Sequence, residues 1–111
     1  MKLSEAMKAG IQFYPVQCKR AFSVEQRNAA CALGTAWAGK KGRDDMDMHF
    51  LESGKIVDEW PFLDDIAVQQ YESPEYEQPE EINFYTVILW LNDHYDWTRE
   101  AIADWLETVG L

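Results

Sequence analysis

The side chains best suited to chemistry in this chain are its two histidines, which both have carboxylates close in sequence. His49 follows Asp44, Asp45 and Asp47, and His94 stands between Asp93 and Asp96. Neither set matches a known metal site: the glycine and terminal glutamate of a calcium-binding loop are missing, and the histidines do not share a helical turn. We therefore expect surface histidines and no metal ligand.

The two cysteines are the next candidates. Cys18 and Cys31 are thirteen positions apart, which is not a metal-ligand spacing, and two cysteines are too few for a disulfide scaffold. We expect free, partly buried thiols. No catalytic residue or cofactor is predicted, because no carboxylate is singled out and the chain lacks a glycine-rich phosphate loop, a serine elbow and a Cys-X-X-Cys motif.

Charge is distributed very unevenly along the chain. The total is −10, but residues 1–43 carry +6, from eight Lys or Arg against two Glu, and residues 44–111 carry −16. The change falls within residues 39–45, where glycines and adjacent charges predict an exposed loop. Such an excess of negative charge disfavours binding to nucleic acid and to anionic membranes.

Length and composition favour one domain over residues 1–111. With 111 residues and 47% hydrophobic side chains, the chain can bury a core without a metal ion or disulfide. No N-terminal stretch has the pattern of a secretory signal, and no apolar run is long enough for a membrane helix. We expect a cytoplasmic protein that does not enter membranes.

The first half of the chain predicts two helices. Residues 3–9 form the first, with Ser4 as its cap and Gly10 as its end, and an extended connector follows through Pro15. The second runs from Ser23, in a capping box with Gln26, to residue 38. Its small residues at 29–36 would allow another element to approach closely.

The middle of the chain is less regular. A short β-hairpin around Ser53-Gly54, with arms at 48–51 and 55–57, and irregular structure are equally compatible with residues 44–60. Pro61 predicts the start of a short helix through residue 68 that turns Leu63 inward. Residues 72–81, with two prolines and five glutamates, predict a surface linker.

The last third predicts two more helices. Residues 82–91 are apolar and would suit a strand or a helix; we favour a helix whose first turn is residues 79–81, ending at residues 92–94. The final helix is capped by Thr98 and has one apolar stripe, with Arg99 among the polar residues off that stripe. The stripe consists of Ile102, Trp105, Leu106 and Val109.

The predicted fold is therefore a mostly α-helical small domain of four or five helices, with room for one short β-hairpin between Met46 and Trp60. Residues 98–106 are similar to the first helix of a helix-turn-helix, but its reading helix would begin at the last two residues. Because the surroundings are also acidic, we expect no direct nucleic-acid binding.

Three motifs resemble a group of small uncharacterised bacterial and phage-associated proteins. They are Leu3-Ser4-Glu5-Ala6, Cys31-Ala32-Leu33-Gly34, and Leu91-Asn92-Asp93 followed by Trp97 to Glu107. The resemblance covers about a third of the chain and implies no activity, cofactor or site residue. Residues 40–80 differ from the group, whose members often have further cysteines there.

The sequence favours a non-enzymatic, acidic protein-protein interaction module. Exposed aromatic side chains are common at binding hot spots, and flanking carboxylates would steer a basic partner. The predicted contact residues are Tyr71, Glu75, Tyr76, Glu77, Glu80 and Glu81. A nucleic-acid mimic that inhibits a basic protein and a small ligand-binding domain or enzyme are the alternatives, and self-association of the two oppositely charged segments stays open.

Overall fold

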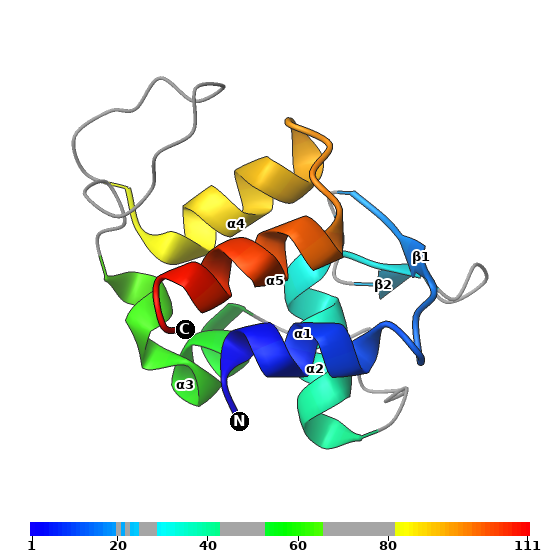
Figure 1. Ribbon diagram of the computed structural model, residues 1–111, viewed down its shortest axis with the longest axis horizontal. Coiled ribbons are helices and arrows are strands. Elements are labelled where there is room, and N and C mark those ends of the chain that lie inside the picture. Colours follow the sequence, from blue (N-terminus) through cyan, green and yellow to red (C-terminus); the bar gives the residue numbers. More distant parts are fainter. Residues whose placement is uncertain (20, 22, 25–28, 43–52, 66–81) are drawn as a thin grey trace.

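Five α-helices, a 3-10 helix and a three-stranded sheet make up the part of the chain that the computed structural model describes: residues 1–19, 21, 23–24, 29–42, 53–65 and 82–111 (Figure 1). The predicted class, mostly helical with a small β component, is confirmed. None of the described helices is long and apolar enough to cross a membrane. The elements are α1 Leu3–Gly10, β1 Val16–Gln17, β2 Ser23–Val24, β3 Ala29–Ala30, α2 Ala32–Lys41, α3 Ser53–Glu59, η3 Pro61–Asp64, α4 Phe84–Asp93 and α5 Arg99–Thr108.

The core lies where α1 packs on α2 and α5, and where α4 packs on α2, α5 and η3. In Figure 1, α1 and α5 lie side by side and α2 runs behind them. Each helix contributes fully buried apolar side chains to one shared cluster, which is the arrangement expected of a single hydrophobic core. Its largest members include Leu3, Met7, Leu33, Ile56, Leu63, Ile88, Leu91, Ile102 and Leu106.

The contact between α1 and α2 depends on two glycines. A Cβ built on Gly10 would lie 1.8 Å from the carbonyl oxygen of Thr35, and one built on Gly39 would lie 1.8 Å from that of Ala6. No side chain fits there, so the two backbones touch directly. A close approach was predicted at residues 29–36, and the structure has one at Thr35; its second contact is at Gly39, which was predicted to follow the helix.

The predicted start of the second helix is wrong. Ser23 and Val24 form a strand, and α2 begins nine residues later, at Ala32, with Cys31 as its N-cap. Strand β3 lies between the parallel strand β1 and the antiparallel strand β2 and is almost fully buried. Hydrogen bonds on both sides of β3 therefore override the helix propensity of its alanines.

The predicted β-hairpin around Ser53-Gly54 is also wrong, because residues 53–59 form helix α3. Ile56 in α3 and the core residues Trp60 and Leu63 that follow it have a helical spacing. Each of the three is at most 4% exposed. Pro61 begins a helix as predicted, but it is a short 3-10 helix that ends at Asp64. Residues 43–52 and 66–81, including the predicted linker and the rest of that helix, lie outside the described residues.

Two predicted helix starts need correction. Ser4 does not cap α1, since the N-cap position is Lys2; the buried Ser4 hydroxyl instead donates to the carbonyl oxygen of Leu111 at 2.8 Å. Residues 82–91 are helical as favoured, but α4 starts at Phe84 and not at 79–81. Asn83 supplies its cap, accepting from the backbone N–H of Thr86 at 2.8 Å, which fixes this start.

The last helix agrees with its prediction except at one residue. Thr98 caps α5 by accepting from the N–H of Ala101, and Ile102 and Leu106 are fully buried. Arg99, which was expected on the polar face, is only 3% exposed. The polar face of α5 otherwise reaches α1, where Glu107 and Asp104 pair with Lys8.

Replacing Gly39 by Ala should destabilise the protein by about 2 kcal/mol or more, because the added methyl group must push α1 away from α2. Gly54→Ala in α3 is the matched control: its Cβ would meet nothing within 4 Å, so we expect a neutral or slightly stabilising effect. Urea unfolding of both variants measures the difference. Equal stabilities of the two variants would contradict a backbone contact at Gly39.

Candidate functional site

A buried asparagine holds the end of the small sheet against the helices. The parallel pairing of β1 and β3 continues to Cys18, whose N–H donates to the carbonyl oxygen of Ala30 at 3.2 Å. Beyond this point the side chain of Asn92 takes the place of the next backbone bond. Its Oδ1 accepts from the N–H of Ala32 at 3.0 Å, and its Nδ2 donates to the Cys18 carbonyl oxygen at 2.9 Å. Asn92 thus links β1, α2 and α4 at a position with no exposure to solvent.

Gln17 extends the same network to α5. Its Nε2 donates to Asn92 Oδ1 and to the Trp97 carbonyl oxygen, both at 2.8 Å, and its Oε1 accepts from the N–H of Arg99 at 3.1 Å. Asn92 Nδ2 also donates to Asp93 Oδ1 at 2.8 Å. Both amide side chains therefore have their donors and acceptors occupied within the protein.

Arg99 is a buried cation that binds carbonyl groups. Its guanidinium donates to the carbonyl oxygen of Tyr14, to that of Pro15 at 3.0 Å and to the hydroxyl of Thr35 at 3.0 Å. Among the described residues no carboxylate lies within ion-pair distance of it, and its Nε–H is buried without an acceptor. The guanidinium fork therefore ties α5 to the chain before β1 and to α2.

Burial lowers the pKa of Arg99, since desolvation disfavours the charged form, and the neighbouring Glu100 carboxylate raises it in part. An arginine nevertheless remains charged at neutral pH. It stays buried because its planar fork reaches three oxygens at once. The contacts of the guanidinium thus connect parts of the fold.

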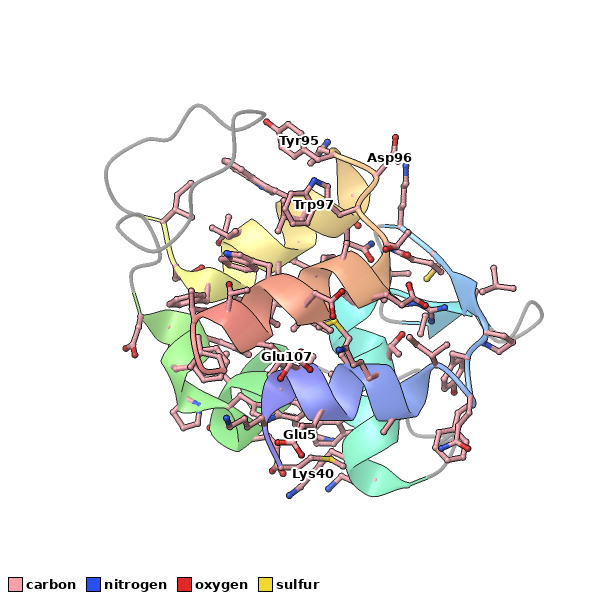
Figure 2. All side chains as sticks on the ribbon, in the orientation of Figure 1. Glu5, Lys40, Tyr95, Asp96, Trp97 and Glu107 are labelled. Atoms are coloured by element: carbon pink, nitrogen blue, oxygen red, sulfur yellow. The ribbon has the colours of Figure 1, made fainter. Side chains whose placement is uncertain are left out.

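A small open pocket of about 200 Å³ lies beside this network. Tyr95, Asp96 and Trp97 gather at the corner between α4 and α5 that borders it (Figure 2). Asp96 has a left-handed backbone with φ of 55°, a conformation that aspartate tolerates better than most residues, and it pairs with Lys19. The lining residues are Gln17, Lys19, Asn92, Asp96 and Trp97.

The chemistry that this pocket offers is limited. The amides of Gln17 and Asn92 are occupied by internal bonds, and the charges of Lys19 and Asp96 are paired with each other across exposed positions. No nucleophile and base stand together there, as a catalytic site would require. Gln17, Asn92 and Arg99 form a polar joint that connects the sheet to the helices.

The predicted contact residues lie outside the described residues, as does His49, and they stay predictions. They are Tyr71, Glu75, Tyr76, Glu77, Glu80 and Glu81. His94 is exposed, as expected of a surface histidine. Within the described ranges, no group of three or more metal-binding side chains is close enough to hold an ion.

Comparison of the chain with protein-family models, with curated proteins and with solved structures found no significant match. The resemblance to the group of small bacterial and phage-associated proteins therefore stays a prediction. Two members of the polar joint do fall within its motifs, since Asn92 and Arg99 belong to the C-terminal one.

Sequence reasoning missed Arg99, Asn92 and Gln17 as structural residues. Each is polar and stands in or next to a segment that looked like an ordinary helix end or connector. The one available signal was Asn92, a polar residue at the end of the most apolar stretch of the chain. Its partners come from positions 60 to 75 residues away, which no local pattern could reveal.

Asn92→Ala should destabilise the protein by about 2–4 kcal/mol, because it leaves the buried Ala32 N–H and the Cys18 carbonyl without partners. Asn83→Ala, which removes only the cap of α4, should cost about 1 kcal/mol and is the matched control. Thermal and urea unfolding would separate the two. An Asn92 variant no less stable than the Asn83 variant would disprove the central role of this amide.

Arg99→Met keeps the apolar stem but removes the donors to Tyr14, Pro15 and Thr35. We expect a loss of about 2 kcal/mol in unfolding free energy. The hydrogen bonds that are lost contribute more than is gained when no cation has to be buried. Arg99→Lys should fall between Met and wild type, since one ammonium group cannot reach all three oxygens. If Arg99→Met unfolds at the same urea concentration as wild type, the cost of burying the cation equals the gain from its hydrogen bonds, which would contradict this expectation.

Proposed function

We propose that this chain is a non-enzymatic protein-binding module whose contact surface is the acidic segment 66–81. The observation that carries the proposal is the way the described residues hold the two ends of this segment. The backbone N–H of Phe84 donates to the carbonyl oxygen of Asp65 at 3.0 Å. Asp65, which directly precedes the segment, is therefore bonded to Phe84, which follows it by three residues.

The base of the segment is rigid. Leu63, two residues before Asp65, is fully buried, and Phe84 is 2% exposed. The ring of Phe84 packs edge-on against Phe62, with 5.6 Å between centroids, and lies 6.0 Å from the ring of Trp105. The residues that flank the segment are thus held in a packed part of the protein.

Charge supports a basic partner. The sixteen residues of the segment include five glutamates and no lysine or arginine. By contrast, several carboxylates of the described part are already paired within the protein: Asp104 and Glu107 with Lys8, Asp96 with Lys19, and Glu59 with Lys40. The segment is therefore a run of one charge sign next to a packed part of the protein, and it includes Tyr71 and Tyr76 as candidate hot spots.

The distribution of the described carboxylates favours this proposal over a nucleic-acid mimic. A mimic needs carboxylates along one continuous face. Those of the described residues are spread over α1, α3, η3 and α5, with Glu5, Asp58, Asp64 and Glu100 as exposed examples. A discrete acidic segment is the simpler way to recognise a basic surface.

The test exchanges Glu75, Glu77, Glu80 and Glu81 together for Gln. Immobilised wild-type protein first captures its partner from a lysate of its own host at moderate salt, and the purified partner is then used in surface plasmon resonance. We expect the variant to associate roughly tenfold or more slowly at low salt, with a smaller difference at high salt, because steering by charge is screened.

The matched control removes the same number of charges elsewhere, with Glu5→Gln, Asp58→Asn, Glu100→Gln and Asp104→Asn, all at exposed positions of the described helices. It should associate at nearly the wild-type rate. Equal slowing of both variants would show that only net charge matters, and an unchanged rate for the segment variant would remove the proposal. Competition by duplex DNA for the same partner would instead favour the mimic.

A further inference from the structure

The sheet register places the two cysteines opposite each other. Parallel pairing matches Val16 with Ala29 and Gln17 with Ala30, and the bond from the Cys18 N–H to the Ala30 carbonyl oxygen belongs to this last pair. Cys18 and Cys31 are the next residues on the two segments, so the same register extended by one residue sets them opposite each other. Paired strands lie roughly 5 Å apart, which is within the Cα spacing that a disulfide needs.

The electrostatics of the two thiols also show that they are neighbours. Burial raises the pKa of Cys18, while the charge of Arg99 and a hydrogen bond from the backbone N–H of Cys31 lower it. Burial raises the pKa of Cys31 to about 12. The Gly34 N–H lowers this pKa in part, and the nearby Cys18 raises it. Cys18 is therefore near enough to Cys31 to act on the pKa of its thiol. Both are free thiols in the structure.

We propose that Cys18 and Cys31 form an intramolecular disulfide when the protein meets a low-molecular-weight disulfide such as oxidised glutathione. The two thiols, thirteen positions apart in sequence, would then covalently join the end of β1 to the N-cap of α2. The bond would lie beside Asn92, whose amide bridges the same two segments by hydrogen bonds. This dithiol is a modification site that is independent of the acidic segment.

The reaction consists of two thiol-disulfide exchanges. Cys18 attacks first, because it is half-exposed while Cys31 is 2% exposed. Its thiolate bonds to one sulfur of glutathione disulfide, and the other glutathione leaves as a thiolate. The Cys31 thiolate then attacks the Cys18 sulfur and releases the second glutathione. The protein loses two electrons and two protons, and one glutathione disulfide becomes two glutathione thiols.

Little in the fold opposes the new bond. The Cys31 sulfur now accepts from the Gly34 N–H at a long 3.5 Å, and the Cys18 thiol donates to the Ala21 carbonyl oxygen at 3.3 Å. Both contacts are weak, so their loss costs little. The disulfide would stabilise the folded protein, because it closes a loop in the unfolded chain and so reduces the conformational entropy that is lost on folding.

The experiment incubates the folded full chain with oxidised glutathione at pH 7 and pH 9 and follows thiol content, intact mass and melting temperature. We expect both thiols to disappear with a mass loss of about 2 Da and no retained glutathione, reversibly with dithiothreitol. Oxidation should be faster at pH 9, because the raised pKa of Cys18 leaves little thiolate at pH 7. The melting temperature should rise by several degrees.

Cys18→Ser is the main control, since this half-buried position tolerates a hydroxyl: it should gain no stability in oxidised glutathione. Peptide mapping after digestion must join the Cys18 peptide to the Cys31 peptide. Stable retention of one glutathione per chain, a dimer joined through Cys18, or two unreacted thiols in folded protein at pH 9 would each overturn the proposal.

Discussion

The structure depends on one buried amide. Asn92 completes a parallel strand pair that has run out of backbone partners, and it does so from the last turn of a helix. Burying an amide is costly unless each of its groups is bonded, and here all of them are. The strand β1, the start of α2 and the end of α4 therefore have one mutual arrangement that satisfies the site.

Arg99 and the glycine contact extend that constraint across the molecule. The guanidinium needs the carbonyls of Tyr14 and Pro15 in place, and the hydroxyl of Thr35 as well. Thr35 lies in α2, and Gly10 allows α1 to contact α2 at the Thr35 carbonyl oxygen. Displacing α2 would break both contacts, which makes the N-terminal half of the fold a single cooperative unit.

Both proposals concern positions next to residues that this packing holds in place. Asp65 and Phe84, on either side of the acidic segment, are bonded to each other at a packed aromatic cluster. Cys18 and Cys31 lie beside Asn92, where β1 meets α2. Oxidation would add a covalent link to the contacts that Asn92 already makes there.

The sequence by itself determined the elements whose signals are local. The cap at Thr98, the stripe through Ile102 and Leu106, the proline start at Pro61 and the overall helical class all follow from neighbouring residues, because helix periodicity and capping act over one or two turns. Of the predicted contact surface, nothing lies within the described residues. Only the tertiary structure decided that Ala29 and Ala30 form a strand, that Arg99 is buried and that Asn92 is central. Their partners stand far along the chain, and a hydrogen bond between distant segments leaves no periodic trace in either one.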